Sequence, residues 1–554
     1  MQSETRKCQN CKLNFIIEPE DFNFYEKMKV PPPTFCPECR NQRRLAMRNE
    51  RVFYWRNCHS CGEKIISYYH PEKDQVVWCP KCWWSDKLGP FKYGKNFDFS
   101  KSFFEQFKEL YKKVPTLSLD VVNCKDSAYV SYCGDDNHCY FDIAGEANEY
   151  CYYCKFVKYS RDCLDCSFVY NSELAYECVN CHRVYGSTHL SKCQDCNNCH
   201  FLYDCRGCQN CFGCWSLRNK QYHIFNQPYS RDEYIKQLEE LKLKSFKSTE
   251  NVKKKFEEES AQAIIKFASM AKCVNCTGDD QFACKNIKDS FDVTNAENGR
   301  WLNDVLDAKE CRDLNFSLYK PSFDIELIST LNLGNSGFCN ASHYCYDAWY
   351  SDKCNNSSDI FGCIALSKQK NCILNKQFSP EEYKVHKERI IEHMKKTGEW
   401  GEFFPVGTSG FGYNESVAQE YFPISEKECG RRGLDWWNKT PDTHGKETMK
   451  SAEIPDSINE INENFVKEIL ACTLCGKNFR VVSYELSIYR KIGLPLPRLC
   501  PNCRHEKRNI VAGIRRLWHR KCMNVGCPNE FETSYAPDRP EEVYCESCYN
   551  KEVY

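Results

Sequence analysis

Sixteen of the 42 cysteines stand near the two ends of the chain in closely spaced pairs that could bind a metal ion. Zn2+ takes four donors in a tetrahedron, and a short turn that carries two thiols supplies half of that set. Two such turns close one site and leave no position for a substrate. We therefore predict four structural zinc sites with four cysteine ligands each, formed by consecutive pairs; an interleaved pairing, first with third and second with fourth, is the alternative. The predicted ligands are Cys8, Cys11, Cys36, Cys39, Cys58, Cys61, Cys79, Cys82, Cys472, Cys475, Cys500, Cys503, Cys522, Cys527, Cys545 and Cys548.

The two ends of the chain repeat one another. Cys8 and Cys36 lie 28 positions apart, and so do Cys472 and Cys500. A shift of 464 positions superimposes further residues, among them Asn14 on Asn478, Phe15 on Phe479, Tyr25 on Tyr489, Pro37 on Pro501 and Arg40 on Arg504. The sequence therefore predicts the same tandem pair of zinc modules at its beginning and at its end.

The first module resembles a known family of small domains. From Cys8 to Arg44 the chain resembles the short probable zinc-ribbon domain family of bacterial proteins. The residues that carry the resemblance are Cys8-Gln9-Asn10-Cys11, Phe15, Tyr25, Pro31-Pro32-Pro33 and Cys36-Pro37-Glu38-Cys39-Arg40, and Cys472 to Arg508 carries the same pattern. The resemblance implies that these eight cysteines bind zinc, and the family brings no established activity. The whole chain resembles large uncharacterised Cys-rich zinc-ribbon proteins of ultra-small bacteria.

A basic stretch joins the two modules at each end. Residues 40–56 and 504–521 each contain one acid among many bases, with Trp55 and Trp518 among the interleaved aromatic residues. Arginine together with rings that can stack on bases is typical of a nucleic-acid contact, and here RNA or a ribonucleoprotein is favoured over DNA. The alternative is a solvated connecting segment. The candidate nucleic-acid contacts are Arg40, Arg43, Arg44, Arg48, Arg51, Arg56, Arg504, Lys507, Arg508, Arg515, Arg516 and Arg520.

The middle of the chain carries a cysteine ladder with a period of three. All 16 cysteines between Val121 and Leu217 fall on one phase, and small residues such as Ser, Val and Ala fill the phase elsewhere. A packed helix repeats every 3.6 residues and a flat strand every two, so neither explains the pattern. A narrow solenoid with every third side chain in its bore does explain it. A longer repeat, at every 12 or 15 positions, is superimposed on the period of three.

The ladder returns in the second half of the chain. One phase runs over 284–317 and, after a slip, another over 327–366. Charged, helix-favouring segments follow both ladders, and the second starts at Ser379-Pro380-Glu381-Glu382, a typical helix N-terminus. We expect such helices to cap the solenoid ends. We also expect the aromatic cluster at 103–107 to pack on the first coil.

These elements predict a mainly β protein. Two Cys-laddered narrow β-solenoid halves with helical caps are flanked at both ends by tandem four-cysteine zinc ribbons. The predicted segments are zinc ribbon 1 (1–48), zinc ribbon 2 (49–86), a helical connector (87–120), Cys-ladder β-solenoid 1 (121–230), a helical linker or cap (231–272), β-solenoid 2 (273–378), a capping helix (379–400), an irregular linker (401–465), zinc ribbon 3 (466–512) and zinc ribbon 4 (513–554).

The ladder thiols and the outer faces of the solenoids leave two further functions open. Buried reduced cysteines are small hydrophobic side chains, so packing is the first interpretation of the ladder. Stacked Cys-x-x-Cys pairs could instead store metal or exchange disulfides. The outer face is rich in tyrosine, as at Tyr150 and Tyr176, and residues 120–215 are acidic. Such a surface could bind a protein, which makes a protein–protein adaptor the other alternative.

Composition and absent motifs narrow the function. The 554 residues contain 76 basic and 76 acidic side chains, so only local patches could bind a polyanion. Mean hydropathy is −0.66, and no apolar run is long enough to span a membrane. The stretch from Met1 to Cys8 lacks the apolar core of a signal peptide, which predicts a cytoplasmic protein. Metalloprotease, phosphate-loop and nucleophile-elbow motifs are missing. We therefore expect a non-enzymatic zinc-binding scaffold that binds nucleic acid.

Overall fold

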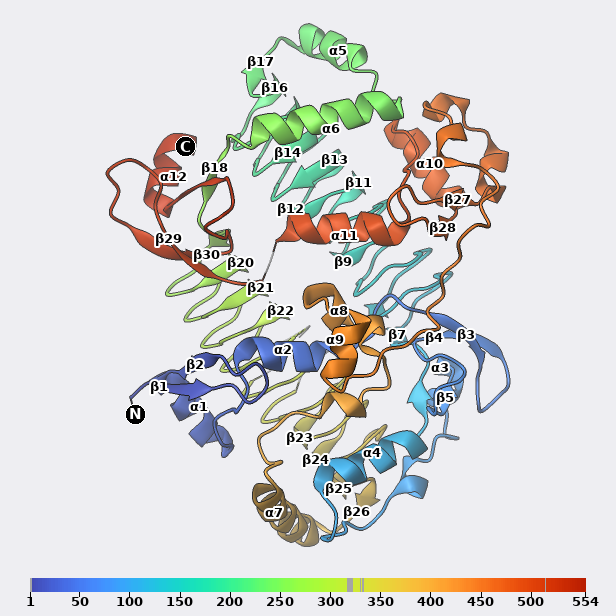
Figure 1. The fold of residues 1–554 in the computed structure, drawn as a ribbon, viewed down its shortest axis with the longest axis vertical. Coiled ribbons are helices and arrows are strands. Elements are labelled where there is room, and N and C mark those ends of the chain that lie inside the picture. Colours follow the sequence, from blue (N-terminus) through green and yellow to red (C-terminus); the bar gives the residue numbers. More distant parts are fainter. Residues whose placement is uncertain (1, 316–321, 329, 331–332, 514) are drawn as a thin grey trace. The chain divides into compact units, whose positions relative to one another are not determined.

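The computed structural model describes residues 2–315, 322–328, 330, 333–513 and 515–554, and the chain forms two compact units (Figure 1). Unit 1 consists of Met1–Leu119 and Ala268–Thr440, and unit 2 consists of Asp120–Phe267 and Pro441–Tyr554. Each unit therefore combines one solenoid with the pair of ribbons from the far end of the chain. Ribbons 1 and 2 belong with solenoid 2, whereas ribbons 3 and 4 belong with solenoid 1.

The solenoid of unit 2 is a stack of short, regular coils. Parallel pairing joins residues 12 positions apart, as in Lys125 with Asn137, and the Lys125 N–H donates to the Asp136 carbonyl at 2.8 Å. The chain turns at every third residue, where φ is positive (54° at Asn123, 45° at Asp126). Each coil therefore has four sides of equal length. The predicted narrow β-solenoid is confirmed, and its larger repeat is the shorter of the two expected from the sequence.

The corner residues lie in the left-handed region of backbone space. After glycine, Asn and Asp tolerate this conformation best, and other side chains there cost about 1–2 kcal/mol. Aromatic residues nevertheless occupy many corners and stack on the corner one coil later, as Phe156 does on Phe168 at 5.2 Å. Regular hydrogen bonds between coils and this outer stacking hold the strained corners in place.

Eleven strands of unit 2 lie along the sides of the coils. Most form one sheet in the order β17-β16-β15-β14-β13-β12-β10-β9, with β11 paired to β13. Pairing is parallel except for the β16–β17 hairpin that ends the sheet. The strands are β7 (Val121–Val122), β8 (Cys133–Gly134), β9 (Lys155–Lys158), β10 (Ser167–Tyr170), β11 (Glu173–Tyr176), β12 (Val179–His182), β13 (Tyr185–Ser191), β14 (His200–Tyr203), β15 (Gln209–Phe212), β16 (Gln221–Ile224) and β17 (Gln227–Pro228).

The bore of this solenoid is filled by the cysteine ladder. All of its cysteines except the partly exposed Cys124 are buried, together with Val, Ala and Leu at the same phase. Each thiol can donate to two carbonyls: the Sγ of Cys163 lies 3.4 Å from the Arg161 carbonyl oxygen and 3.9 Å from that of Ser172. The Ser160 hydroxyl donates in the same way, to the Lys158 carbonyl at 2.9 Å. The bore thus selects small side chains that can also donate a weak hydrogen bond.

Two helices follow the first solenoid, α5 (Arg231–Glu240) and α6 (Phe246–Ser260). Ser230 caps α5, and both helices cover an apolar cluster that includes Phe201 and Phe212 of the solenoid. The segment predicted as a helical linker does not remain helical to its end. β18 (Ile264–Lys266) pairs in parallel with β31 (Glu542–Tyr544) of ribbon 4, because the buried Ile265 packs against that ribbon.

Ribbons 3 and 4 complete unit 2. In Figure 1 helix α11 runs across the strands of the solenoid, and it packs on β10 and β12. Their elements, with the short helices before them, are η4 (Ser451–Glu453), η5 (Ile458–Glu460), η6 (Glu463–Lys467), β27 (Leu470–Ala471), β28 (Asn478–Phe479), α10 (Ser483–Ile492), α11 (Pro501–Ala512), β29 (Trp518–Lys521), β30 (Glu530–Thr533), β31 and α12 (Glu546–Val553).

The solenoid of unit 1 has the same construction with less regular coils. Most of them pair 12 positions apart, but Val274 pairs with Lys285, 11 positions later, and Lys309 pairs with Ser322, 13 positions later. The extra residue of the longer coil accounts for the predicted slip of phase; Ser317, assigned to the first phase, lies outside the described residues. The strands are β19 (Met270–Ala271), β20 (Gly278–Phe282), β21 (Ser290–Thr294), β22 (Asn303–Leu306), β23 (Tyr346–Trp349), β24 (Ser358–Phe361), β25 (Lys370–Ile373) and β26 (Lys376–Gln377).

Helices cover the end of the second solenoid. α7 (Pro380–Thr397) begins after Ser379, whose hydroxyl accepts from the Glu382 N–H at 3.2 Å. The predicted aromatic cluster lies on α4 (Phe103–Lys113), but it does not pack on a first coil. The Phe103 ring lies 5.4 Å from Phe361 near the far end of solenoid 2.

Ribbons 1 and 2 and a stretch of short helices complete unit 1. Each ribbon contains a β-hairpin followed by a helix that starts at the second cysteine pair. The elements are β1 (Glu4–Lys7), β2 (Asn14–Ile17), α1 (Pro19–Met28), α2 (Pro37–Leu45), β3 (Tyr54–Asn57), β4 (Lys64–Ser67), β5 (Val77–Trp78), α3 (Pro80–Trp83), η1 (Pro90–Tyr93), β6 (Thr116–Leu117), η2 (Val406–Thr408), η3 (Tyr413–Glu415), α8 (Val417–Tyr421) and α9 (Glu426–Arg431).

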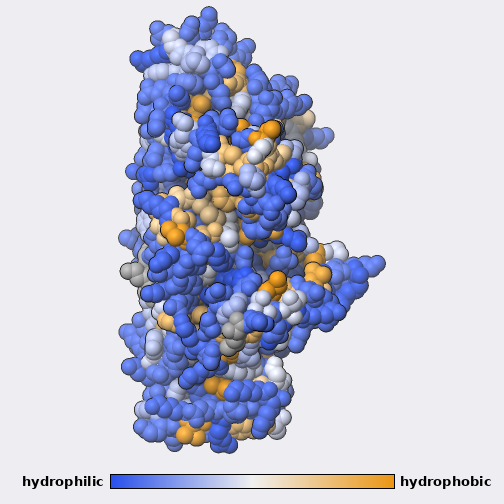
Figure 2. All heavy atoms as spheres, turned by 90° about the vertical axis from the view of Figure 1, so that its left-hand side faces the viewer, coloured by the Kyte–Doolittle hydropathy of each residue, from blue (hydrophilic) through white to orange (hydrophobic). Residues whose placement is uncertain are grey.

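The face of the molecule shown in Figure 2 is largely hydrophilic, with hydrophobic residues in small groups. Among the described residues, no helix combines the length and the apolar character that crossing a membrane would require.

Candidate metal centres and the arginine contacts

The structure assembles the sixteen terminal cysteines into four clusters. In each cluster the four Sγ atoms lie within 4.8 Å of one another, close enough to bind one metal ion. Every cluster unites two consecutive pairs, so the consecutive pairing is confirmed over the interleaved one. The clusters are Cys8, Cys11, Cys36, Cys39; Cys58, Cys61, Cys79, Cys82; Cys472, Cys475, Cys500, Cys503; and Cys522, Cys527, Cys545, Cys548.

Local backbone structure positions the thiols of each cluster. The first pair lies on a tight turn, closed in ribbon 1 by the Lys12 N–H donating to the Cys8 carbonyl at 3.1 Å. The second pair lies at a helix N-terminus, where Cys36 precedes α2 and Pro37 occupies its first position. The Cys36 N–H also donates to the Cys8 Sγ at 3.2 Å. A helix N-terminus favours thiolates, which are the state that binds a metal.

Hydrogen-bond donors favour the ionised form of the first thiol in two of the clusters. Burial opposes ionisation of Cys58, but the backbone N–H groups of Cys79, Cys61 and Ser60 outweigh it and lower the pKa of this thiol to about 7. Burial also opposes ionisation of Cys472, and surrounding backbone N–H groups again lower its pKa to about 7. The clusters are therefore suited to binding a cation.

Several arginines of the first basic stretch lie inside unit 1 instead of on its surface. The Arg40 Nε donates to Asp313 Oδ2 at 2.7 Å, and Arg43 pairs with Glu326 at 3.2 Å. The Arg44 guanidinium is fully buried near the same two acids, 3.6 Å from Asp313. The cluster attaches ribbon 1 to solenoid 2, so its charges are neutralised within the unit.

Unit 2 repeats this arrangement with the equivalent arginines. Arg504 pairs with Asp165 at 3.2 Å and with Glu485 at 3.0 Å. Arg508 pairs with Asp165 at 2.8 Å and donates to the Tyr153 carbonyl at 3.0 Å. Asp165 and both of its arginine partners are buried. The same 464-position shift that relates the ribbons thus relates their attachment to the solenoids.

The predicted set of nucleic-acid contacts needs correction. Arg48 is buried against Glu50, at 2.7 Å, and Arg56 is buried and donates to the Tyr69 carbonyl at 3.2 Å. With the attachment clusters, seven of the twelve candidate residues are therefore removed from solvent: Arg40, Arg43, Arg44, Arg48, Arg56, Arg504 and Arg508. The five that keep exposed surface are Arg51, Lys507, Arg515, Arg516 and Arg520.

The acids that neutralise these arginines were not predicted from the sequence. Asp165, Asp313 and Glu326 all occupy solenoid corners with positive φ. Acidic side chains are frequent at such corners, as at Asp126. A corner acid that binds an arginine therefore carries no signal that distinguishes it from one that faces solvent.

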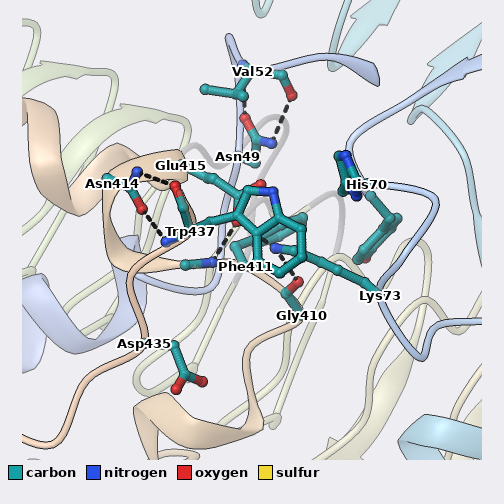
Figure 3. A network of polar contacts seen from close by, with 12 residues as sticks. Asn49, Val52, His70, Lys73, Gly410, Phe411, Asn414, Glu415, Asp435 and Trp437 are labelled. Carbon is teal, nitrogen blue, oxygen red and sulfur yellow. Dashed lines mark hydrogen bonds and ion pairs between the residues drawn. The ribbon is translucent and has the colours of Figure 1, made fainter. Parts of the chain in front are cut away.

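Part of the predicted irregular linker is bound to ribbon 2 by a polar network (Figure 3). Lys73 donates to the Gly410 carbonyl at 3.0 Å and pairs with Glu415. Glu415 also accepts from the Tyr54 hydroxyl at 2.7 Å, and the Lys73 Nζ lies 4.8 Å from the centre of the Trp437 ring. The segment after α7 is therefore packed against the ribbon.

The chain matches no protein-family profile. A DNA ligase of Mesomycoplasma hyopneumoniae strain 232 is 23% identical over 256 residues, which is 44% of this chain and 34% of the ligase. The DNA ligase of strain 7448 is 23% identical over 188 residues, or 32% of this chain and 25% of the ligase. The chain thus spans about a third or less of the curated relatives it matches.

A solved structure was also similar in part. It is a crystal structure of a protein proposed to be an acetyltransferase from Desulfovibrio desulfuricans G20, with 9% sequence identity and a TM-score of 0.11. The similarity covers 50% of this chain and 82% of that one. A TM-score this low carries no conclusion about fold or function.

Proposed function

We propose that the protein is a non-enzymatic scaffold with four structural zinc ions that binds nucleic acid, RNA or a ribonucleoprotein more readily than DNA. The observation that carries the proposal is a cation placed over an indole ring on the corresponding strand of both units. In ribbon 2 the Lys64 Nζ lies 5.1 Å from the ring of Trp55 in β3. In ribbon 4 the Arg516 guanidinium lies 5.6 Å from the ring of Trp518 in β29.

A ring beside a cation suits a single-stranded nucleic acid. The base stacks on the ring and the cation attracts the phosphate, whatever the base sequence. Trp55 is 51% exposed, so a base can reach its face. Single-stranded RNA loops and ends present unstacked bases more often than duplex DNA does, which is why RNA is preferred in the proposal. The partial similarity to bacterial DNA ligases also favours nucleic acid as the partner.

The donor sets support zinc in a structural role. Four thiolates in a tetrahedron suit Zn2+ and occupy every coordination position, so no substrate or water can bind to the ion. The buried ladder thiols donate to backbone carbonyls, as Cys193 does to Ser191 at 3.3 Å. This geometry favours packing over metal storage or thiol exchange.

Binding to short oligonucleotides tests the proposal. We expect the full chain to bind a fluorescent single-stranded RNA in an anisotropy titration, more tightly than DNA of the same length. Loss of one stacked base costs about 1–3 kcal/mol, so Trp55→Ala and Trp518→Ala should each raise Kd roughly 5- to 150-fold.

Trp84→Ala is the matched control, because Trp84 also belongs to ribbon 2 and is also 51% exposed. It should leave Kd unchanged. An equal loss in the Trp84 variant, or no binding of any nucleic acid at low salt, would refute the proposal.

One observation favours a protein–protein adaptor as the second candidate. Tyr344 and Tyr346 on solenoid 2 are 51% and 60% exposed, and exposed tyrosines are frequent in protein interfaces. If the protein binds no nucleic acid, capture of a protein partner that is lost in the Tyr344→Ser, Tyr346→Ser double variant would support this function.

A further inference from the structure

The bore of solenoid 1 contains a polar cluster that breaks the apolar ladder. Cys133, Asp136 and Asp142 occupy ladder positions, and one ligand atom from each lies within 4.8 Å of the others. Both carboxylates are fully buried, and Cys133 is only 4% exposed. Outside the ribbons, no other group of three metal-ligating side chains among the described residues comes so close together.

Half of the carboxylate oxygen atoms in this cluster have no donor. Asp136 Oδ1 accepts from the Asn148 N–H at 3.0 Å, and Asp142 Oδ2 accepts from the Asn148 side-chain amide at 2.9 Å. Asp136 Oδ2 and Asp142 Oδ1 accept no hydrogen bond from the described residues. Buried acceptors without a donor, on two neighbouring carboxyl groups, require a proton or a cation.

The ladder also lacks a side chain beside this cluster. Gly145 lies one coil after Cys133 and brings no side chain into the bore. A Cβ atom placed there would lie 2.4 Å from Asp142 Oδ2 and 2.8 Å from Asp136 Oδ2. The Gly145 N–H donates to the Cys133 Sγ at 3.2 Å. Glycine is therefore required here, because any side chain would collide with the carboxylate oxygens.

We propose that Cys133, Asp136 and Asp142 bind a divalent transition-metal ion, most simply Zn2+, as a fifth site inside solenoid 1. One thiolate and two carboxylates are a donor set that zinc accepts, whereas Mg2+ and Ca2+ avoid thiolates. The thiol loses its proton to solvent when the ion binds.

The coil before the cluster is partly open to solvent. Of the four ladder residues in the preceding coil, Val121, Cys124 and Ser127 are partly exposed and Val130 is buried. The site therefore lies one coil from the start of the solenoid. Binding there would neutralise the buried carboxylates and join three sides of one coil, in contrast to the ribbon sites at the ends of the chain.

Counting metal equivalents in the full chain tests the site. Protein saturated with Zn2+ and freed of excess metal by gel filtration should contain five zinc ions. The Asp136→Asn, Asp142→Asn double variant should contain four. Cys163→Ser is the control, because Cys163 is a buried ladder cysteine of the same bore outside the cluster, and it should keep five.

A second measurement serves if the double variant fails to fold. Wild-type protein titrated with Co2+ should take up four equivalents in thiolate-rich sites and a fifth equivalent with weak sulfur-to-metal absorption. Cys133→Ser should lose only this fifth equivalent. Four equivalents in the wild type would show that the carboxyl pair shares a proton and would overturn the proposal. A fifth equivalent that persists in the double variant would overturn it as well, without bearing on nucleic-acid binding.

Discussion

Asp165 provides the strongest test of how the ribbons are attached to the solenoids. It is fully buried and pairs with both Arg504 and Arg508. Asp165→Asn keeps the shape of the side chain and suits the left-handed corner, where φ is 53°. The variant leaves two buried guanidinium groups opposite a neutral amide. Removal of one partner from a buried ion pair costs about 3–5 kcal/mol, so we expect unit 2 to lose that much stability.

Asp195 supplies a matched control on the same solenoid. It is also a corner aspartate, with φ of 54°, and it pairs with Arg183 at 2.5 Å, but its side chain is 47% exposed. Exposed pairs contribute about 0.2–1 kcal/mol, so Asp195→Asn should cost no more than that. The two variants differ in burial and in the number of arginine partners, which is two for Asp165 and one for Asp195.

Hydrogen exchange measured by mass spectrometry reads out the effect locally. In Asp165→Asn the opening equilibrium of α11 should rise by roughly two to three and a half orders of magnitude, which corresponds to about 3–5 kcal/mol. Exchange of α11 in Asp195→Asn should match the wild type. Equal exchange of α11 in the two variants would refute the conclusion that the buried arginines hold the ribbon in place.

Two further predictions concern buried groups of the ladder regions. Burial lowers the pKa of His189 to about 3, below its ordinary value of 6.5, so the unfolded chain binds the extra proton first and stability falls as the pH drops below about 6.5. Between pH 6.5 and 5, urea unfolding should show that the free energy of unfolding of the wild type falls by up to about 1.4 kcal/mol per pH unit more than that of His189→Gln. Parallel plots of this free energy against pH would contradict the prediction. In zinc-loaded native protein, a chromogenic disulfide reagent should react quickly with only three cysteines outside the ribbons, the partly exposed Cys124, Cys273 and Cys276. The buried ladder thiols should react only after unfolding. Rapid reaction of the whole ladder would show that its bore is open.

The solenoids and the metal clusters could be predicted because their physical constraints are local. A bore that accepts every third side chain admits only small residues, so the ladder from Val121 to Leu217 shows the period directly. Pairs such as Cys8 and Cys11 lie on one turn, so their spacing already predicts shared coordination. The register in which the coils pair was harder to predict from the sequence. Cys, Ser and Val are interchangeable in the bore, so only the hydrogen bonds between coils distinguish the shorter of the two expected repeats from the longer.

Tertiary structure alone decided what the arginines do. Arg40 and Arg504 have the composition of a nucleic-acid contact in the sequence, because each begins a stretch with many bases and a single acid. Their partners Asp313 and Asp165 lie hundreds of positions away along the chain. Charge pairs over such distances follow from how the chain folds back, and no local pattern records them. By itself, the sequence determined the period of the bore and the thiols of each cluster, because both depend on residues that are close together along the chain. Folding determined which solenoid each ribbon joins and which cations remain exposed, because burial is a property of the whole unit.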